Sequence, residues 1–361
     1  MTAESIDGVE GVEGVEDVED AEDAEGVDGS DEVGEVGGAG VGAEEFAACG
    51  FRIGDPGSHE EVLPRLAVPA EPHAGYGNFP VPACPGWRKP DTVFDGARHG
   101  PLTVRAASTR GDGHRHVGTP RQDDYCLYGT DDWLVAAVAD GVSQGALSHL
   151  AAEAAAETGC LALATQLRAG VAPERLDCES VLRDSAKAVV RAVHHSLARE
   201  TGETGVLSLG AVAQLASAAV VYAVVPVAAG PETGPEAGRE ALLLWVGDVT
   251  AWTLSDAKGW LPLTELKADG GTKVVTGTTA ALPLLGRESW HRATFTLAAD
   301  EAVVLMTDGV GDALGDGSGE VGAALRSVWR RPPEPHAFAA QVDYQRSTFT
   351  DDRTVVGIWS S

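Results

Sequence analysis

Four short acidic stretches lie far apart in this sequence, and each one adjoins an apolar run. The stretches are Gln122-Asp123, Asp140-Gly141, Asp308-Gly309 and Asp351-Asp352. Carboxylates placed where buried strands emerge can supply hard oxygen ligands to a divalent cation without burying uncompensated charge. One Asp-Gly pair is a common turn and means little alone. Four such stretches in one chain favour a metal site built at the ends of strands.

The apolar runs and helical spacings predict the fold class. Buried strands are expected at 133–139, 302–307 and 354–359, and further strands at 218–227, 242–246 and 250–254. Helical spacing of apolar residues predicts helices over 147–162, 182–197 and about 320–330. Strands, two long helices and then more strands indicate an α+β fold, since a doubly wound sheet would alternate regularly.

The negative charge is distributed unevenly along the chain. The formal net charge is −29, and residues 1–45 hold 17 Asp and Glu with no Lys or Arg. Such a segment cannot offset its ordering entropy by burial, so we expect a disordered acidic tail over 1–45. The Pro-rich residues 46–100 are expected to be a linker or a partly packed extension, followed by one domain over 101–361.

The composition also bounds partners and location. An acidic chain argues against nucleic acid or an anionic membrane as partner, because phosphate backbones are bound by clustered cations. No apolar run reaches the ~18 residues of a membrane span, and the N-terminal residues lack the features of a signal peptide. Five cysteines without Cys-x-x-Cys spacing are expected to be reduced structural thiols. We therefore expect a cytoplasmic protein.

The motifs, in this order, resemble those of the metal-dependent protein phosphatases of the PP2C family. The resemblance covers roughly residues 101–361, with an opening similar to a divergent bacterial branch that reads Gly-x-x-His and then Gln-Asp. Its counterparts here are Gly111-Asp112-Gly113-His114, Gln122-Asp123, Asp140-Gly141, Val246-Gly247-Asp248, Thr307-Asp308-Gly309-Val310-Gly311-Asp312 and Asp351-Asp352-Arg353-Thr354.

The resemblance implies a four-layer α/β/β/α sandwich of two packed antiparallel sheets, with two Mn²⁺ or Mg²⁺ ions at one rim. It implies that Asp140 bridges the ions, with the Gly141 carbonyl as a second ligand at the same turn. It further implies that Asp308 and Asp351 hold the first ion and that Asp123 holds the other side of the site. Asp312 matches a carboxylate for an added metal in the family, but an Asp at a helix start is equally expected.

The chain departs from the family at the phosphate-binding position. The family's arginine lies five residues before the first motif Asp, where this chain has Gly118. His114 is the candidate for phosphate contact or proton transfer, with Arg115, His116 and Arg121 as alternatives. A histidine of the family's turn is replaced at Ser143-Gln144-Gly145, and no Asp precedes the strand at 218, so a third metal site is expected to be incomplete.

Two further acidic residues are expected to be structural. Asp248 is expected to close a hairpin turn between two strands. Asp352 stands where the family has Asn, and we expect it to orient its turn.

The resemblance implies hydrolysis of phosphoserine or phosphothreonine in proteins by a water that two metal ions activate. The protein would then oppose a bacterial-type kinase. The alternative is a catalytically weak or inactive PP2C-fold module that binds phosphorylated partners or a regulator. Retention of the four carboxylates favours the enzyme, because converging like charges are unfavourable without a cation. Substrate choice is expected to come from loops such as 264–292.

Overall fold

The computed structural model describes residues 89–202, 205–230, 238–266, 280–286, 289–344, 346 and 349–360. They belong to the second of two compact units, Glu44–Ser361. The expected acidic tail over 1–45, most of the stretch 46–100, and residues 267–279 and 287–288 of the 264–292 loop lie outside the described residues.

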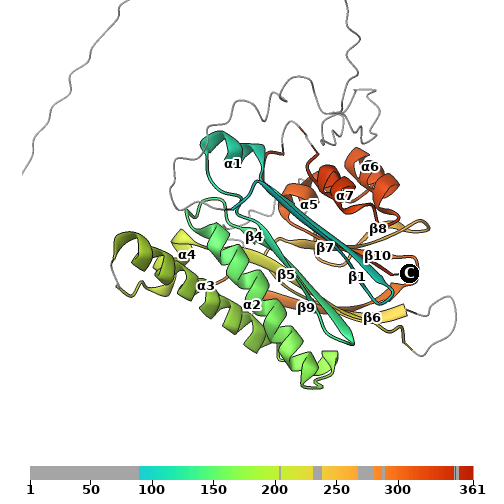
Figure 1. Cartoon of the computed structure of the whole chain (residues 1–361), viewed down its shortest axis with the longest axis horizontal. Helices are drawn as coiled ribbons and strands as arrows, with labels where there is room; N and C mark the ends of the chain where they lie inside the picture. Colours follow the sequence, from blue (N-terminus) through green and yellow to red (C-terminus); the bar gives the residue numbers. More distant parts are fainter. Residues whose placement is uncertain are drawn as a thin grey trace, which may run out of the picture. The chain divides into compact units, whose positions relative to one another are not determined.

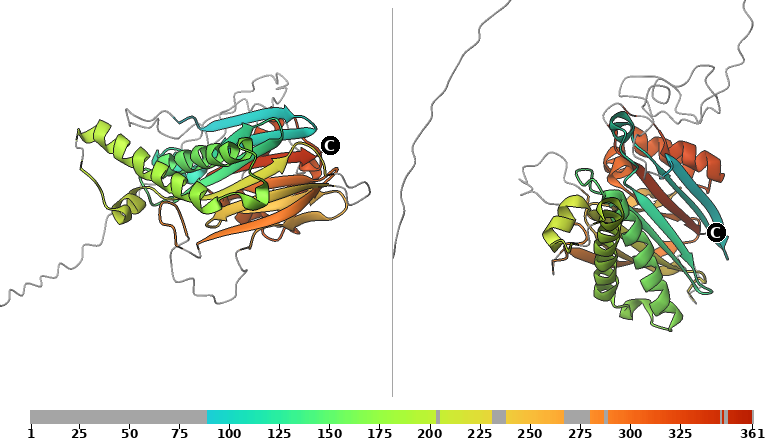
Figure 2. Two further views of the ribbon diagram at one scale, coloured as in Figure 1. Left: turned by 90° about the horizontal axis from the view of Figure 1, so that it is seen from below. Right: turned by 60° about the vertical axis from the view of Figure 1, so that its left-hand side comes forward.

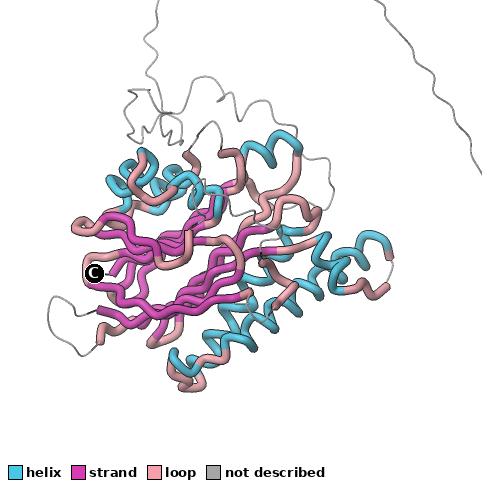
Figure 3. Tube along the Cα trace, turned by 180° about the vertical axis from the view of Figure 1, so that it is seen from behind, coloured by secondary structure: helices cyan, strands magenta, loops and turns pink. Residues whose placement is uncertain are grey.

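The described strands form two antiparallel sheets (Figures 1 and 3). The six-stranded sheet has the order β1 (Thr92–His99), β2 (Leu102–Thr109), β11 (Arg353–Ser360), β10 (Ala302–Met306), β7 (Thr250–Ser255) and β8 (Gly259–Pro262). The five-stranded sheet has the order β3 (Asp124–Gly129), β4 (Trp133–Gly141), β5 (Ala218–Pro226), β6 (Gly238–Val246) and β9 (Trp290–Ala298).

The helices cover the outer faces of the two sheets, as Figure 2 shows. The five-stranded sheet packs against α2 (Ser148–Arg168) and α3 (Cys178–Thr201), and the short α4 (Leu209–Leu215) follows α3. The six-stranded sheet packs against α5 (Asp308–Leu314), α6 (Glu320–Trp329) and α7 (Pro335–Val342). The described residues also form two short elements, α1 (Asp112–Val117) and the 3₁₀ turn Pro173–Arg175. The predicted α/β/β/α sandwich is confirmed.

Alternation along the strands builds the core. Val104, Val138, Val221, Leu305 and Ile358 are fully buried between the two sheets, and their sequence neighbours face the helices. Burial on both faces explains why β4, β10 and β11 appear in the sequence as continuous apolar runs rather than as alternating ones.

A close contact between a helix and the sheet fixes the position of α2. A Cβ atom added at Gly159 would lie 2.2 Å from the ring of Tyr222, so glycine is required for this approach. The Tyr222 hydroxyl donates a hydrogen bond of 2.7 Å to the Ala155 carbonyl. A buried tyrosine thus finds its polar partner inside the helix that covers it.

The structure differs from one sequence prediction at the turn between β6 and β7. The expected hairpin around Asp248 is wrong, because β6 pairs with β5 and β9 while β7 pairs with β10 and β8. The Gly247-Asp248 turn therefore passes from one sheet to the other. Within the stretch 46–100, expected to be a linker or a partly packed extension, β1 begins at Thr92 and pairs along its length with β2.

Among the residues that the structure describes, no helix is long and apolar enough to span a membrane.

Candidate functional site

Strand pairing brings the acidic stretches to one rim of the sandwich. In the five-stranded sheet, Asp124 of β3 pairs with Ala139 of β4, which sets Asp123 near Asp140. In the six-stranded sheet, Met306 of β10 pairs with Val355 of β11. Asp308 follows β10 and Asp351 precedes β11, so both lie at the same end of that sheet.

Hydrogen bonds join the two sheets at this rim. The Thr307 hydroxyl donates to Asp123 Oδ2 at 2.8 Å and accepts from the Thr354 backbone N–H at 3.0 Å. The Asp308 backbone N–H lies 3.4 Å from Asp140 Oδ2. Carboxylates from the five-stranded sheet are thus held by the strand ends of the six-stranded sheet.

The electrostatics of the rim are those of crowded carboxylates. Burial raises the pKa of Asp140 well above its usual value, and the charges of Asp123, Asp308, Asp351 and Asp248 raise it further. Burial also raises the pKa of Asp123, as do the charges of Asp352 and Asp351, against the lowering effect of the Thr307 hydrogen bond. Like charges at this density are relieved by a bound cation.

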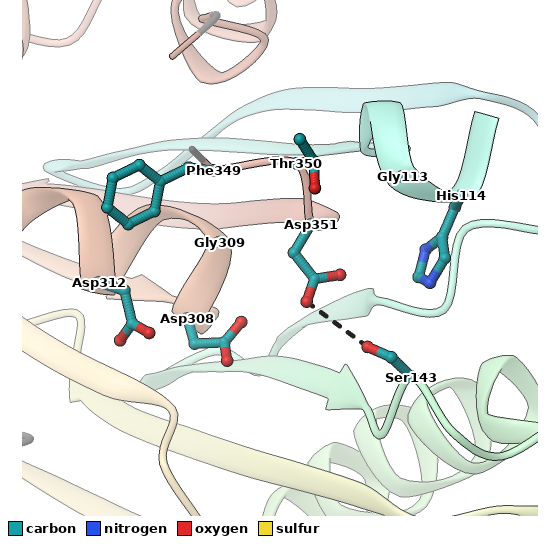
Figure 4. Close-up of a pocket in the computed structure, with 9 residues that line it drawn as sticks. All are labelled: Gly113, His114, Ser143, Asp308, Gly309, Asp312, Phe349, Thr350 and Asp351. Carbon is teal, nitrogen blue, oxygen red and sulfur yellow. Dashed lines mark hydrogen bonds between the residues drawn. The ribbon is translucent and has the colours of Figure 1, made fainter. Parts of the chain in front are cut away.

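A pocket of about 440 Å³ opens beside these carboxylates. Four of its lining residues are predicted site residues: His114, Asp308, Asp312 and Asp351. Its other lining residues are Gly113, Ser143, Gly309, Phe349 and Thr350. Figure 4 shows the Asp308 and Asp351 carboxylates directed toward one another, with Ser143 and His114 beyond Asp351.

The remaining predicted ligands lie next to the pocket rather than on its wall. Asp123 is 2% exposed. The Asp140 carboxylate lies beside the backbone N–H of Asp308, which lines the pocket. Gly141 is buried at the end of β4, where an added Cβ would lie 2.5 Å from the Gln122 carbonyl oxygen. Only glycine permits this approach of the two motif backbones.

His114 is held by an acidic partner. Its Nδ1 atom lies 2.9 Å from Asp352 Oδ2. Burial alone would lower the pKa of His114, but the contact with Asp352 and the charges of Asp352 and Asp351 outweigh it, so the pKa is raised. One ligand atom from each of His114, Asp351 and Asp352 lies within 4.8 Å of the others, close enough to share a metal ion.

Asp352 contacts two backbone N–H groups in addition to His114. It accepts the backbone N–H of Gly111 at 2.6 Å and that of Gln122 at 2.5 Å. The carboxylate therefore fixes both the start of α1 and the segment leading to Asp123. The sequence offered a signal for this role, namely an acid in place of the family's amide.

The alternative phosphate-contacting residues lie elsewhere. Arg115 is buried and paired with Asp91 and Asp112. Arg121 is also buried, and it lines a different hollow beside Tyr125. His116 is exposed, and it is not among the residues that line the carboxylate pocket. Of the four candidates, only His114 lines this pocket.

Two features of the site were missed from the sequence. Lys89 donates to the Asp123 carbonyl at 3.0 Å and pairs with Asp124 at 2.9 Å, which anchors the first motif. It lies in the stretch expected to be a linker, where no local pattern marks it. Phe349 forms an apolar side of the pocket just before Asp351, and its only sequence signal is that proximity.

The donor set fits divalent cations. Carboxylate oxygens and a backbone carbonyl suit Mg²⁺ and Mn²⁺, which prefer hard oxygen ligands. The raised pKa values of Asp123 and Asp140 agree with a cation site, because a bound cation would favour the charged form of both carboxylates.

A protein-family model described as Protein phosphatase 2C matches residues 110–342. No curated protein matches the chain. Among solved structures, RsbX in complex with magnesium is 12% identical with a TM-score of 0.45, covering 74% of this chain and 100% of that one.

Two mycobacterial structures are similar to a comparable degree. The PPM Ser-Thr phosphatase MsPP from Mycobacterium smegmatis, in complex with cacodylate, is 19% identical with a TM-score of 0.41, covering 72% of this chain and 98% of that one. The Mycobacterium tuberculosis serine/threonine phosphatase PstP/Ppp is 16% identical with a TM-score of 0.43, covering 71% and 97%.

Proposed function

The chain belongs to the protein phosphatase 2C family, and from this premise we propose that it hydrolyses phosphoserine and phosphothreonine in proteins with two divalent cations, Mn²⁺ or Mg²⁺. The family is metal-dependent, and its substrates are phosphoproteins. A bacterial-type Ser/Thr kinase would supply the substrate.

The observation that carries the proposal is the convergence of carboxylates from both sheets on one rim. Asp140 and the Gly141 carbonyl would be ligands of the ions, Asp308 and Asp351 would hold one ion, and Asp123 would serve the other. Asp312, on the pocket wall one helical turn after Asp308, would be the ligand of a further ion. When bound, the cations would activate a water and neutralise the charge of the phosphoryl oxygens.

The chain's own residues would orient the substrate and move a proton. His114 lines the pocket, and its Nδ1 atom is engaged by Asp352, which leaves Nε2 for a phosphate oxygen or the leaving oxygen of serine. Ser143 Oγ lies 3.5 Å from Asp351 Oδ2 and helps to fix that carboxylate. Phe349 offers an apolar surface to the substrate's side chain.

One observation favours a second candidate, a module that binds phosphorylated partners without turning them over. None of the described residues that line the pocket is Lys or Arg, and Gly118 occupies the family's arginine position. A phosphate would then be held by cations and His114 alone. Weak transition-state stabilisation would leave binding as the main property.

Phosphate release from synthetic peptides tests the proposal. We expect the full chain with Mn²⁺ to release phosphate from phosphoserine and phosphothreonine peptides and much less from a phosphotyrosine peptide. Asp140→Asn should abolish release, whereas Asp131→Asn, an exposed carboxylate in the β3–β4 turn, should not. Peptide binding without release by the wild-type chain would support the module instead.

A further inference from the structure

The fold brings together two thiols that the sequence keeps apart. Cys126 lies on β3 and Cys160 on α2, and they are 34 positions apart. Cys160 Sγ lies 3.7 Å from the Cys126 carbonyl oxygen. Both side chains belong to the core between the five-stranded sheet and α2. The third cysteine in the described part of the chain, Cys178, begins α3.

The two thiols differ in access and in acidity. Cys126 is half-buried, whereas Cys160 is fully buried. A hydrogen bond from the Cys160 thiol lowers the pKa of Cys126, against burial and the charges of Glu157 and Asp124. Burial raises the pKa of Cys160. Cys126 is therefore the more accessible and the more readily ionised of the two thiols.

We propose that Cys126 and Cys160 are a peroxide-sensitive pair that closes to a reversible disulfide between β3 and α2. The Cys126 thiolate attacks one oxygen of hydrogen peroxide, so the O–O bond breaks and, with one proton, a sulfenic acid and water form. The Cys160 sulfur then attacks the Cys126 sulfur, the S–O bond breaks, and a second water leaves. Two thiols and one peroxide give one disulfide and two waters.

The position of the pair links it to the rim of carboxylates. β3 begins at Asp124, directly after Asp123, and the segment that the disulfide would close contains β4 with Asp140. A covalent tie across this segment restricts the unfolded chain, so oxidation should raise the midpoint of thermal unfolding by several degrees. The pair does not depend on phosphatase activity.

Trypsin makes the test direct. The chain has no Lys or Arg between Arg121 and Arg168, so one tryptic peptide, 122–168, carries both cysteines and no other. The full chain is treated with hydrogen peroxide, blocked with iodoacetamide and digested. We expect this peptide to lose two hydrogen atoms and take up no alkyl group. Treatment with dithiothreitol before blocking should restore double alkylation.

Single substitutions separate this pair from general oxidation. Cys160→Ser should leave Cys126 as a sulfenic acid that dimedone traps, and it should abolish the rise in the unfolding midpoint. Cys178→Ser is the matched control. It should still form the disulfide between Cys126 and Cys160, and oxidation should still raise its unfolding midpoint. Two alkylated sulfurs after peroxide, or Cys126 joined to a cysteine outside this peptide, would overturn the proposal.

Discussion

The carboxylate of Asp352 lies 2.9 Å from Nδ1 of His114. The same carboxylate accepts the backbone N–H groups of Gly111 and Gln122. One buried side chain at the start of β11 thus orients the histidine of α1 and the segment that leads to Asp123. An aspartate that holds one ring nitrogen fixes the orientation of the ring, and this ring lines the pocket.

Replacing this carboxylate with an amide should separate its roles. In Asp352→Asn, only one oxygen remains as acceptor, so a backbone N–H or His114 loses its partner. We expect a loss of about 1–3 kcal/mol in the free energy of unfolding and turnover lower by about tenfold or more. Thermal unfolding and phosphopeptide turnover measure the two effects. Wild-type turnover in this variant would contradict the positioning of His114 by Asp352.

Removing one carboxylate charge from the rim should lower the affinity for metal and raise the stability of the cation-free fold. Because burial and then the charges of neighbouring carboxylates raise the pKa of Asp140, its ionised form destabilises the cation-free fold as pH rises. We expect Asp140→Asn and Asp308→Asn to lose Mn²⁺ affinity in calorimetric titration. Without cations at neutral pH, each should gain about 1 kcal/mol in the free energy of unfolding. Asp131→Asn serves as the control, and wild-type Mn²⁺ affinity in both variants would refute the ligand assignment.

His149 should make the fold sensitive to acid. Burial and the charge of Lys89 lower its pKa from 6.5 to about 4, so the folded state keeps the ring neutral where the unfolded state takes a proton. Stability should therefore fall as pH falls from about 6.5 to about 4, by up to about 3 kcal/mol.

The His149→Gln variant tests this sign. It should show a smaller loss of stability over the same pH range, measured by urea unfolding in EDTA. His195→Gln, an exposed histidine of α3, should behave as the wild type does. Equal acid sensitivity in all three proteins would show that His149 is not the group responsible.

Gly141→Ala should disturb the rim through the backbone. The added Cβ would lie 2.5 Å from the Gln122 carbonyl oxygen and 2.9 Å from that of Ser148. Since backbone atoms must move, we expect a loss of about 1–3 kcal/mol in the free energy of unfolding and a large loss of turnover. Gly210→Ala in α4, where a Cβ meets no atom within 4 Å, is the matched control. An active, stable Gly141→Ala protein would contradict the close approach of the two motifs.

Much of the fold could be predicted because its central strands are buried on both faces. The runs at 133–139, 302–307 and 354–359 lie within or at the ends of β4, β10 and β11. β1 could not be predicted in this way, since it lies at a sheet edge and most of its residues are exposed. The Gly247-Asp248 pair signals a turn, but a dipeptide cannot tell whether the next strand pairs with its predecessor or enters a second sheet.

The acidic residues of the site could be predicted from the sequence, but the contacts around them could not. The acidic stretches could be located because strand ends carry them, and the structure brings them to one rim, although their roles as ligands stay predictions. The anchoring by Lys89 and the approach of Cys126 to Cys160 depend on tertiary packing. No local spacing encodes such contacts.

Hydrolysis of p-nitrophenyl phosphate by the full chain tests the central claim most directly. The assay compares the chain stripped with EDTA, the same sample after Mn²⁺ is restored in excess, and Asp140→Asn in Mn²⁺. The account predicts turnover only for the wild-type chain with Mn²⁺. Turnover that is unchanged in EDTA, or equal in Asp140→Asn, would contradict a metal-dependent phosphatase built on these carboxylates.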